Sequence, residues 1–256
     1  MQIYIVSHNR ANAQITWEQL PPSYQQQAMI AVYSDELDAY SAYPTIEVPL
    51  AHKGIGNKRH YLVSNSPDPH VVLMDDDLVF AARRQDERSK FSPATHSDME
   101  DMFTAIEYSM LAGWAHGAVA MREGGNRDTN EFRFNSRALR CHFYHAGLYN
   151  EHGIRFDRME FMEDFDVTLQ FMEAGHPNII LNEWVHNQSG SNTSGGCSQT
   201  RTPQKQAEAA EELARLHAPF VKVVEKTTKG SWGGGTRKDV TIYWKKKAKA
   251  FGANHG

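Results

Sequence analysis

The chain has 256 residues, of which 40% are hydrophobic and 23% charged, with a formal net charge of −4. This composition is typical of a globular protein and excludes a disordered one. No apolar run approaches the ~18 residues of a membrane-spanning helix, and Met1 leads into a strand-like segment rather than a signal peptide. We therefore expect no membrane association. The two cysteines, Cys141 and Cys197, form no disulfide framework, which favours a cytoplasmic protein.

The charge is unevenly distributed along the chain. Residues 222–256 contain nine Lys and Arg residues and two acids, a net charge of +7, so residues 1–221 carry −11. A basic end on an acidic body suggests an anionic partner such as nucleic acid, and the run Lys245–Lys247 is the candidate contact. A lysine-rich end that only increases solubility is an equally good explanation.

The first third of the chain predicts three strands and a helix. Ile3–Val6 is an apolar strand followed by polar residues suited to nucleotide recognition, although a plain turn would look the same. Further strands are expected at 29–33 and 46–50. Gly54–Arg59 begins a helix that runs to about Ser64, and the free N–H groups of a helix start can bind phosphate.

The most informative segment is Val71–Asp77. Four apolar residues, Val71–Met74, predict a strand buried on both faces, as in a parallel sheet. Three consecutive acids then follow, Asp75, Asp76 and Asp77. Adjacent carboxylates repel one another and need a compensating cation. Strand alternation would point Asp75 and Asp77 the same way, and one or two carboxylates plus phosphate oxygens are the usual ligands of Mg²⁺ or Mn²⁺. A solvated turn without function remains the alternative.

The middle of the chain adds a second set of candidate residues. We expect a charged loop at 83–90, a helix at 97–113, a strand at 118–121 and a further strand at 139–144. The polar loop 122–128 is suited to line an acceptor cleft. Glu163 and Asp164 begin a helix, where the helix dipole favours acids, but an acid facing a cleft there can also act as a general base.

The last third predicts strands at 178–181 and 184–186, the second of them ending in His186. The Gly/Ser/Asn-rich loop 188–199 that follows is typical of a lid that orders over a ligand. A helix at 203–216 has Thr202 as its cap and Pro203 at its first position. Strands at 221–224 and 240–244 complete the chain.

These motifs, taken in order, resemble the GT-A glycosyltransferase pattern over roughly residues 1–200. The pattern consists of a first strand ending in Ser-x-Asn-Arg, the Asp-rich strand end, the Glu-Asp-x-Asp helix start and a strand ending in His before a glycine-rich loop. The opening Met-Gln-Ile-Tyr-Ile-Val-Ser-His-Asn-Arg, the Asp-Asp-Asp-Leu motif and the Val-Lys-Val-Val-Glu-Lys…Tyr-Trp-Lys-Lys-Lys tail resemble the TET-associated glycosyltransferases, phage enzymes of DNA hypermodification.

The resemblance implies a Rossmann-like α/β fold of one domain, with a GT-A core at 1–200 and a C-terminal helix and basic β extension at 201–256. It also implies roles for individual residues. The metal ligands would be Asp75, Asp77 and His186. Asp164 would be the base of an inverting reaction, with Glu163 as the second candidate. The donor-binding residues would be Ser7, Asn9, Arg10, Lys58, Arg59, Asp75 and Asp76. For the acceptor, the candidates are Arg122, Asn126 and Arg127.

The implied reaction is metal-dependent transfer of a sugar from a nucleotide sugar, expected to be a UDP-sugar, to 5-hydroxymethylcytosine or another 5-hydroxymethylated pyrimidine in DNA. The metal would be Mn²⁺ or Mg²⁺, and a phage-encoded enzyme would act in the host cytoplasm. The usual motif is Asp-x-Asp, whereas this chain has three successive acids, so which two bind the metal stays open. Three alternatives remain: a glycan, protein or small-molecule acceptor, a nucleotidyltransferase, or a non-catalytic nucleic-acid-binding protein on the same fold.

Overall fold

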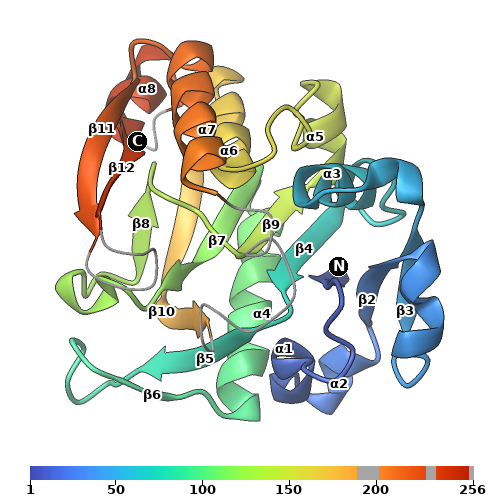
Figure 1. The fold of residues 1–256 in the computed structure, drawn as a ribbon. Helices are drawn as coiled ribbons and strands as arrows, with labels where there is room; N and C mark the ends of the chain where they lie inside the picture. The colour runs from blue at the N-terminus through green and yellow to red at the C-terminus, as the bar shows by residue number, and fades with distance from the viewer. Residues whose placement is uncertain (189–201, 229–234, 254–256) are drawn as a thin grey trace.

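The computed structural model describes residues 1–188, 202–228 and 235–253. A mixed sheet of ten strands carries helices on both faces (Figure 1), with strand order β3-β2-β1-β4-β9-β7-β10-β5-β6 and β8 paired to β10. The strands are β1 (Gln2–Val6), β2 (Ala28–Tyr33), β3 (Thr45–Val48), β4 (His70–Asp75), β5 (Leu78–Arg83), β6 (Phe91–Pro93), β7 (His116–Met121), β8 (Phe132–Phe134), β9 (Cys141–His145) and β10 (Asn178–Gln188). A separate antiparallel hairpin consists of β11 (Val221–Thr228) and β12 (Gly235–Ile242).

Helices connect and cover these strands. The α-helices are α1 (Ile15–Gln19), α2 (Pro22–Gln25), α3 (Ile55–Ser64), α4 (His96–Leu111), α5 (Ala146–Glu151), α6 (Glu163–Glu173), α7 (Pro203–Leu216) and α8 (Trp244–Ala250). Short 3-10 helices are η1 (Ser34–Tyr40), η2 (Leu50–His52) and η3 (Gly125–Arg127). Among the described residues, no helix has both the length and the apolar character that crossing a bilayer requires.

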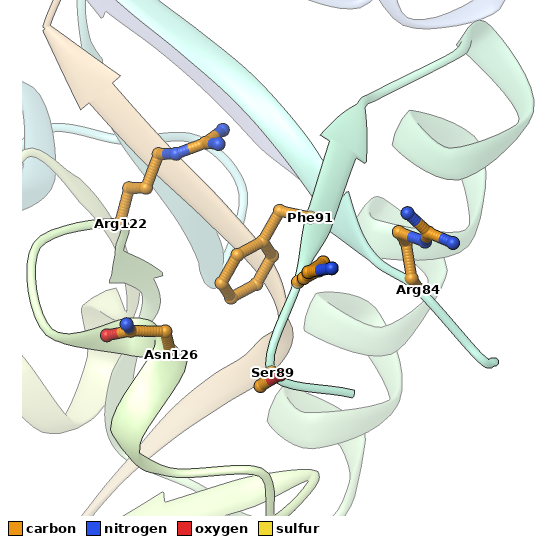
Figure 2. Close-up of a pocket in the computed structure, with 6 residues that line it drawn as sticks. Arg84, Ser89, Phe91, Arg122 and Asn126 are labelled. Carbon is orange, nitrogen blue, oxygen red and sulfur yellow. The ribbon is translucent and has the colours of Figure 1, made fainter. Parts of the chain in front are cut away.

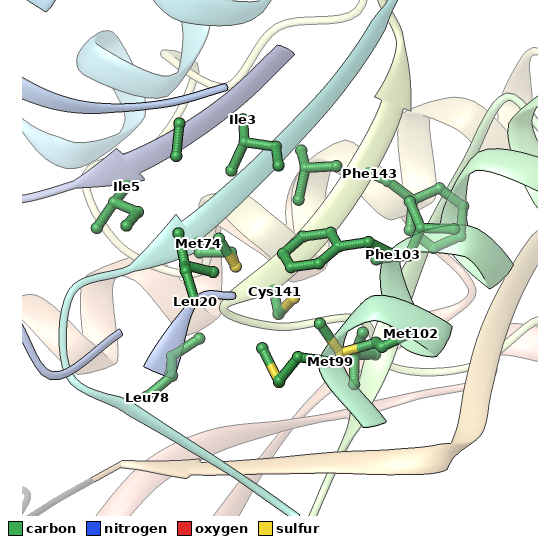
Figure 3. Close-up of a cluster of buried hydrophobic side chains, with 14 of the residues drawn as sticks. Ile3, Ile5, Leu20, Met74, Leu78, Met99, Met102, Phe103, Cys141 and Phe143 are labelled. Atoms are coloured by element: carbon green, nitrogen blue, oxygen red, sulfur yellow. The ribbon is translucent and has the colours of Figure 1, made fainter. Parts of the chain in front are cut away.

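The strand β4 lies in the middle of the sheet, parallel to β1 and antiparallel to β9. Its alternate residues enter two different cores, which is why its apolar run is continuous. Val72 and Met74 pack with α4 on one face (Figure 3). Val71 and Leu73 pack with α3, α5 and α6 on the other. The predicted strand buried on both faces is confirmed, and it carries Asp75 to the sheet edge.

Two expectations about the elements were wrong, and the strand that follows the acids was not predicted. Leu78–Arg83, directly after the acids, is a strand that pairs antiparallel with β10. The two short strands expected at 178–186 are one strand, β10, whose pairing with β7 shifts between Leu181 and Val185. Trp244 begins α8 instead of ending a strand, because Tyr243 ends the extended segment and the lysine run that follows is helical.

The C-terminal elements pack beside α6 (Figure 1). Apolar side chains of α7, β11 and β12 join those of the 159–169 segment in one cluster. Within α8, Lys247 is fully buried and bonds Glu173 and His217. The hairpin lysines Lys226 and Lys238 pair with Asp239 and Glu211. The expectation that Lys245–Lys247 contacts DNA as a unit is therefore wrong for Lys247, and much of the basic charge is neutralised within the fold.

Candidate active site

The three acids lie at a tight turn between β4 and β5. Because β4 ends at Asp75, the strand alternation that would align Asp75 with Asp77 does not continue through the turn. The side chain of Thr16 in α1 holds this turn: its hydroxyl donates to the carbonyl of Asp75 (2.6 Å) and accepts from the N–H of Leu78 (2.9 Å). The backbone of the acidic turn is thus fixed by a residue that no motif identified.

Two arginines supply the compensating positive charge. Arg10 Nη1 lies 2.8 Å from Asp76 Oδ1 and 2.9 Å from Asp77 Oδ2. Arg59 Nη2 lies 2.5 Å from Asp75 Oδ1. The side chains of Asp76 and Asp77 are nearly buried, whereas that of Asp75 is 21% exposed. Of the three acids, Asp75 is therefore the most accessible to a ligand.

Asp76 belongs to the floor of the site. Ser7 Oγ donates to Asp76 Oδ2 at 2.5 Å and also contacts Tyr40 Oη (2.8 Å) and Gln14 Nε2 (2.9 Å). Since a serine hydroxyl has one proton, the Tyr40 hydroxyl must be the donor in its contact with Ser7. Burial raises the pKa of Asp76 to about 6. These three contacts occupy the hydroxyl of Ser7. Ser7 therefore holds its neighbours in place at the expected site of the nucleotide sugar and does not itself contact the nucleotide sugar.

The other predicted donor residues divide into exposed and buried ones. Asn9 is exposed, has a left-handed backbone (φ 54°) and donates its N–H to Glu36 Oε1 at 2.6 Å. Lys58 is 1% exposed, and its ammonium group donates to the carbonyls of Ser7 (2.7 Å) and Ala31 (3.3 Å) at the strand ends. Lys58 thus holds β1 and β2 together and is not placed to grip a phosphate, contrary to expectation.

Arg59 connects the acidic turn to α6. Its guanidinium pairs with Asp75 through Nη2 and with Glu163 Oε1 through Nη1 at 2.6 Å. The predicted donor residue is therefore a buried bridge between the two acidic motifs. The side chain of Arg59 thus brings together two acids, Asp75 and Glu163, that are distant in sequence.

The N-terminus of α6 presents one buried and one accessible acid. Glu163 is buried, whereas Asp164 is half-buried. Burial, with repulsion from Asp164, raises the pKa of Glu163 to about 7. Burial also raises the pKa of Asp164, against the opposing effect of Arg59. Met162, which caps this helix, has a left-handed backbone (φ 62°), a strained conformation that clusters at functional sites.

His186 does not join the acids. It is buried in β10, and its Nε2 donates to the carbonyl of Leu139 at 3.1 Å. Burial lowers the pKa of His186 to about 3. Within the described residues, no group of three His, Cys, Asp or Glu side chains could hold a metal ion.

Two residues after His186 along β10, Gln188 Nε2 reaches Asp77 Oδ1 at 3.3 Å. The rest of the predicted lid, 189–199, lies outside the described residues.

The acids themselves fit a divalent cation. Asp77 has a raised pKa, first because it is buried and then because Asp75 repels it. Two neighbouring carboxylates that repel each other at a partly open edge offer hard oxygen ligands, and Mg²⁺ and Mn²⁺ are commonly held by one or two such groups together with substrate phosphates. Asp75 and Asp77 are therefore the residues to which such an ion would bind.

Two of the three predicted acceptor residues line a pocket. Arg122 and Asn126 border a cavity of about 450 Å³, with Arg84, Ser89, Lys90 and Phe91 on its other sides (Figure 2). Arg127 is exposed on η3 but does not border the cavity. The loop that carries these residues directly follows β7, whose end is fixed by a hydrogen bond from the Arg122 N–H to the His186 carbonyl (2.9 Å).

Arg137 is a residue that sequence reasoning missed. Desolvation lowers its pKa, and the carboxylates of Asp164 and Glu123 act against this shift. Its guanidinium also lies 5.2 Å from the ring of Phe165. Arg137 therefore lies between the N-terminus of α6 and the 122–127 loop. The only signal in the sequence was the density of arginines at 133–140, which fits any surface loop.

Comparisons with known proteins identify the family of the chain. Residues 1–196 match the TET-Associated Glycosyltransferase family. Two relatives, from Enterobacteria phages T6 and T2, are each named Beta-glucosyl-HMC-alpha-glucosyl-transferase. They are 23% and 22% identical over 230 residues, which cover 84% of this chain and 80% of theirs.

Solved structures show the fold. Glucosyl-3-phosphoglycerate synthase from Mycobacterium tuberculosis, in complex with Mg²⁺ and UDP, matches with a TM-score of 0.53 at 12% identity, over 94% of this chain and 87% of that one. Residues 1–349 of S. aureus TarS with UDP-GlcNAc match with a TM-score of 0.50 at 10% identity, over 84% of this chain and 66% of that one. Both neighbours are GT-A glycosyltransferases. The predicted GT-A fold is confirmed, and the chain is a glycosyltransferase that belongs to the TET-associated glycosyltransferase family.

Proposed function

We propose that the protein transfers a sugar from a UDP-sugar to a 5-hydroxymethylated pyrimidine in phage DNA. The observation that carries the reaction is the Arg59 bridge, which joins the strand-end acid Asp75 to the α6 acids at Glu163. A donor diphosphate at the strand ends and an acceptor hydroxyl at α6 would then lie on the two sides of one reacting carbon. The relatives' names support the acceptor, and the UDP-GlcNAc and UDP bound to the two structural neighbours support the donor.

A divalent metal ion belongs to this proposal. Asp75 and Asp77 would hold it, and Arg10 and Arg59 would keep these carboxylates in place. When bound, the ion would stabilise the negative charge that grows on the diphosphate leaving group. The complex of the mycobacterial neighbour with Mg²⁺ and UDP supports this part of the proposal.

Asp164 is proposed as the general base. In the transfer, the bond between the anomeric carbon and the diphosphate oxygen breaks and a bond to the acceptor oxygen forms, while the hydroxyl proton passes to Asp164. Asp164 is favoured over Glu163 because Asp164 is half-buried, whereas Glu163 is buried and paired with Arg59. Its raised pKa increases its proton affinity, which suits a base.

Two features of the relatives' names bear on the stereochemistry and on the acceptor of the proposed reaction. An α-glucosyl product formed from an α-linked donor such as UDP-glucose keeps its configuration, whereas a base at Asp164 suits inversion. The names also describe transfer to HMC that already bears glucose, so glucosylated hydroxymethylcytosine in DNA is the second candidate acceptor. A glycan, protein or free small molecule is the less favoured acceptor class.

One experiment tests these points together. Duplex DNA containing cytosine, 5-hydroxymethylcytosine or β-glucosylated 5-hydroxymethylcytosine would be incubated with the protein, a panel of nucleotide sugars and Mn²⁺, Mg²⁺ or a chelator. Nucleoside mass after digestion identifies the acceptor and the sugar, and proton NMR of the product gives its anomeric configuration. A gain of one hexose on hydroxymethylated or glucosylated DNA, lost with chelator, is the expected result. Failure to modify any DNA while a glycan or protein is glycosylated would refute the DNA acceptor.

A further inference from the structure

The pocket lined by Arg84, Ser89, Lys90, Phe91, Arg122 and Asn126, here named the β6 pocket, contains both neutralised and uncompensated cations. Arg84 pairs with Asp86, and Lys90 Nζ lies 2.8 Å from Glu87 Oε2. No carboxylate among the described residues forms an ion pair with Arg122, although its side chain is exposed. Among the described residues that line the pocket, Arg122 is therefore the cation that a ligand can pair with without breaking an existing ion pair.

The pocket also orients that residue. The guanidinium of Arg122 lies 5.8 Å from the ring centroid of Phe91, and Arg83 lies 4.6 Å from the same ring. Figure 2 shows Arg122 and Asn126 on one side of the cavity and Phe91 between them and Arg84. An arginine held near an aromatic ring loses less conformational entropy on binding, and its planar fork matches a phosphate.

The 122–127 loop packs closely on Phe91 at Gly125. Gly125 is buried, and a Cβ atom at this position would lie 3.4 Å from Phe91 Cζ and 3.4 Å from Val185 Cγ1, which is van der Waals contact. The loop therefore sits directly on the ring and the sheet. Arg122 at its start and Asn126 after Gly125 are consequently held at the mouth of a cavity of about 450 Å³, which is large enough for a phosphate and its neighbouring sugar.

Arg122 follows the end of β7, and β4 and β7 each pair antiparallel with β9, so Arg122 and the strand-end acids lie at the same edge of the sheet. Arg137 interacts electrostatically with Asp164 on one side and with Glu123, the neighbour of Arg122, on the other. An acceptor nucleotide whose hydroxyl faces Asp164 would thus direct its flanking backbone toward Arg122.

We propose that the β6 pocket binds a phosphodiester of the acceptor strand next to the target nucleotide, with Arg122 as the phosphate ligand, Asn126 as a further donor and Phe91 as the residue that positions Arg122. This inference rests on the proposed DNA acceptor. It assigns the pocket to the DNA backbone and not to the target base or to the transferred sugar.

The test compares acceptors with and without phosphodiesters. For Arg122→Ala we expect the KM for a hydroxymethylated oligonucleotide to rise by about 10-fold or more, because a phosphate contact is lost, and the slope of log affinity against log salt to decrease by about 1. Its kinetics with free 5-hydroxymethyl-2′-deoxycytidine and its KM for the nucleotide sugar should match the wild type. Arg215→Ala removes a distant, exposed arginine paired with Glu212 and serves as the charge-matched control with unchanged kinetics.

Phe91→Leu separates positioning from charge. We expect the oligonucleotide KM to rise several-fold while the salt slope stays that of the wild type, because Arg122 keeps its charge. An equal loss of activity on oligonucleotide and free nucleoside in Arg122→Ala would assign the pocket to the base and overturn the inference. Unchanged oligonucleotide kinetics in Arg122→Ala would also overturn it.

Binding measurements keep this inference distinct from the proposed function. Fluorescence anisotropy with an unmodified oligonucleotide requires no turnover. If the wild type modifies no DNA but Arg122→Ala still weakens binding and decreases the salt slope, the proposed function fails and the phosphate site stands. If the wild type modifies DNA while anisotropy and KM are the same in Arg122→Ala, the proposed function stands and the phosphate site fails.

Discussion

Two clusters of buried charge involve different residues of α6: one includes Glu163 at its start, and the other includes Asp166 and Glu173. The cleft cluster joins Asp75, Asp76, Asp77 and Glu163 to Arg10 and Arg59. The C-terminal cluster joins Asp166 and Glu173 to Arg158, His217 and Lys247. In the C-terminal cluster, His217 Nε2 lies 2.6 Å from Asp166 Oδ1, and Lys247 contacts both His217 Nδ1 (2.8 Å) and Glu173.

The pKa values of the carboxyl groups are shifted in opposite directions in the two clusters. In the C-terminal cluster, the hydrogen bonds and charges of His217 and Lys247 outweigh burial and lower the pKa of Glu173 to about 2. In the cleft cluster, burial raises the pKa values of Asp76, Asp77 and Glu163 in spite of two arginines. Fully compensated acids stabilise a fold, whereas acids left short of positive charge at a cleft are typical of a ligand site. The contrast favours a ligand site at the first cluster and a structural role for the second.

The largest expected effect is that of Asp77→Asn on transfer. Without this carboxylate, the metal and the leaving group lose a ligand, so kcat should fall by roughly 10³-fold or more. The melting temperature should stay the same or rise, because the substitution removes a buried charge that Asp75 repels. Initial rates and thermal denaturation measure the two effects, with the exposed Asp101→Asn on α4 as control. A variant that transfers normally would remove Asp77 from the metal site.

The next effect is that of Asp164→Asn, which keeps the shape of the side chain and removes its proton affinity. We expect kcat to fall by roughly 10²–10³-fold, as for the loss of a general base, while nucleotide-sugar affinity measured by calorimetry is retained. Glu163→Gln is the matched comparison and should affect kcat less. Product with the donor's anomeric configuration, together with normal turnover in Asp164→Asn, would argue against a base at this position.

For the C-terminal cluster the expectation is reversed. Lys247→Met breaks a buried ion pair and should cost about 3 kcal/mol of stability, which lowers the melting temperature by roughly 5–10 °C. The kcat of the folded enzyme at low temperature should change little. The control is Lys245→Met, an exposed lysine on the same helix. A Lys247→Met protein with wild-type stability and a raised KM for DNA would make this lysine a DNA contact after all.

The smallest effects concern pH. The pKa of Glu173 is lowered in the folded state, so its stabilising contribution is complete above about pH 4.5 and is lost as pH falls toward about 2. The pKa of Glu163 is raised to about 7, so its ionisation destabilises the fold as pH rises from about 4.5 through 7. Melting curves should therefore show a deficit for Glu173→Gln that shrinks below pH 4.5, and a gain for Glu163→Gln that grows toward pH 8. If the melting temperatures of the wild type and both variants change with pH in parallel, the two clusters do not differ in how ionisation affects stability.

Local patterns determined much of the fold before any tertiary contact was known. The continuous apolar run Val71–Met74 specified a strand buried on both faces, and Thr202 with Pro203 specified the start of α7. The acids at 75–77 and 163–164 were likewise predicted as candidates, because three adjacent carboxylates at a strand end repel one another and an acid at a helix start can act as a base if it faces a ligand.

Only the tertiary structure decided what each candidate contacts. The sequence cannot show that Arg59 bridges Asp75 and Glu163, that Lys58 and Lys247 are buried, or that His186 lies apart from the acids. The strand β5 was missed for the same reason, since its pairing partner β10 is about a hundred residues away in the chain. In the sequence, a charged residue that is exposed to solvent cannot be distinguished from one that is buried in an ion pair. Their roles depend on burial and on partners distant in sequence, and these are fixed only when the sheet brings them together.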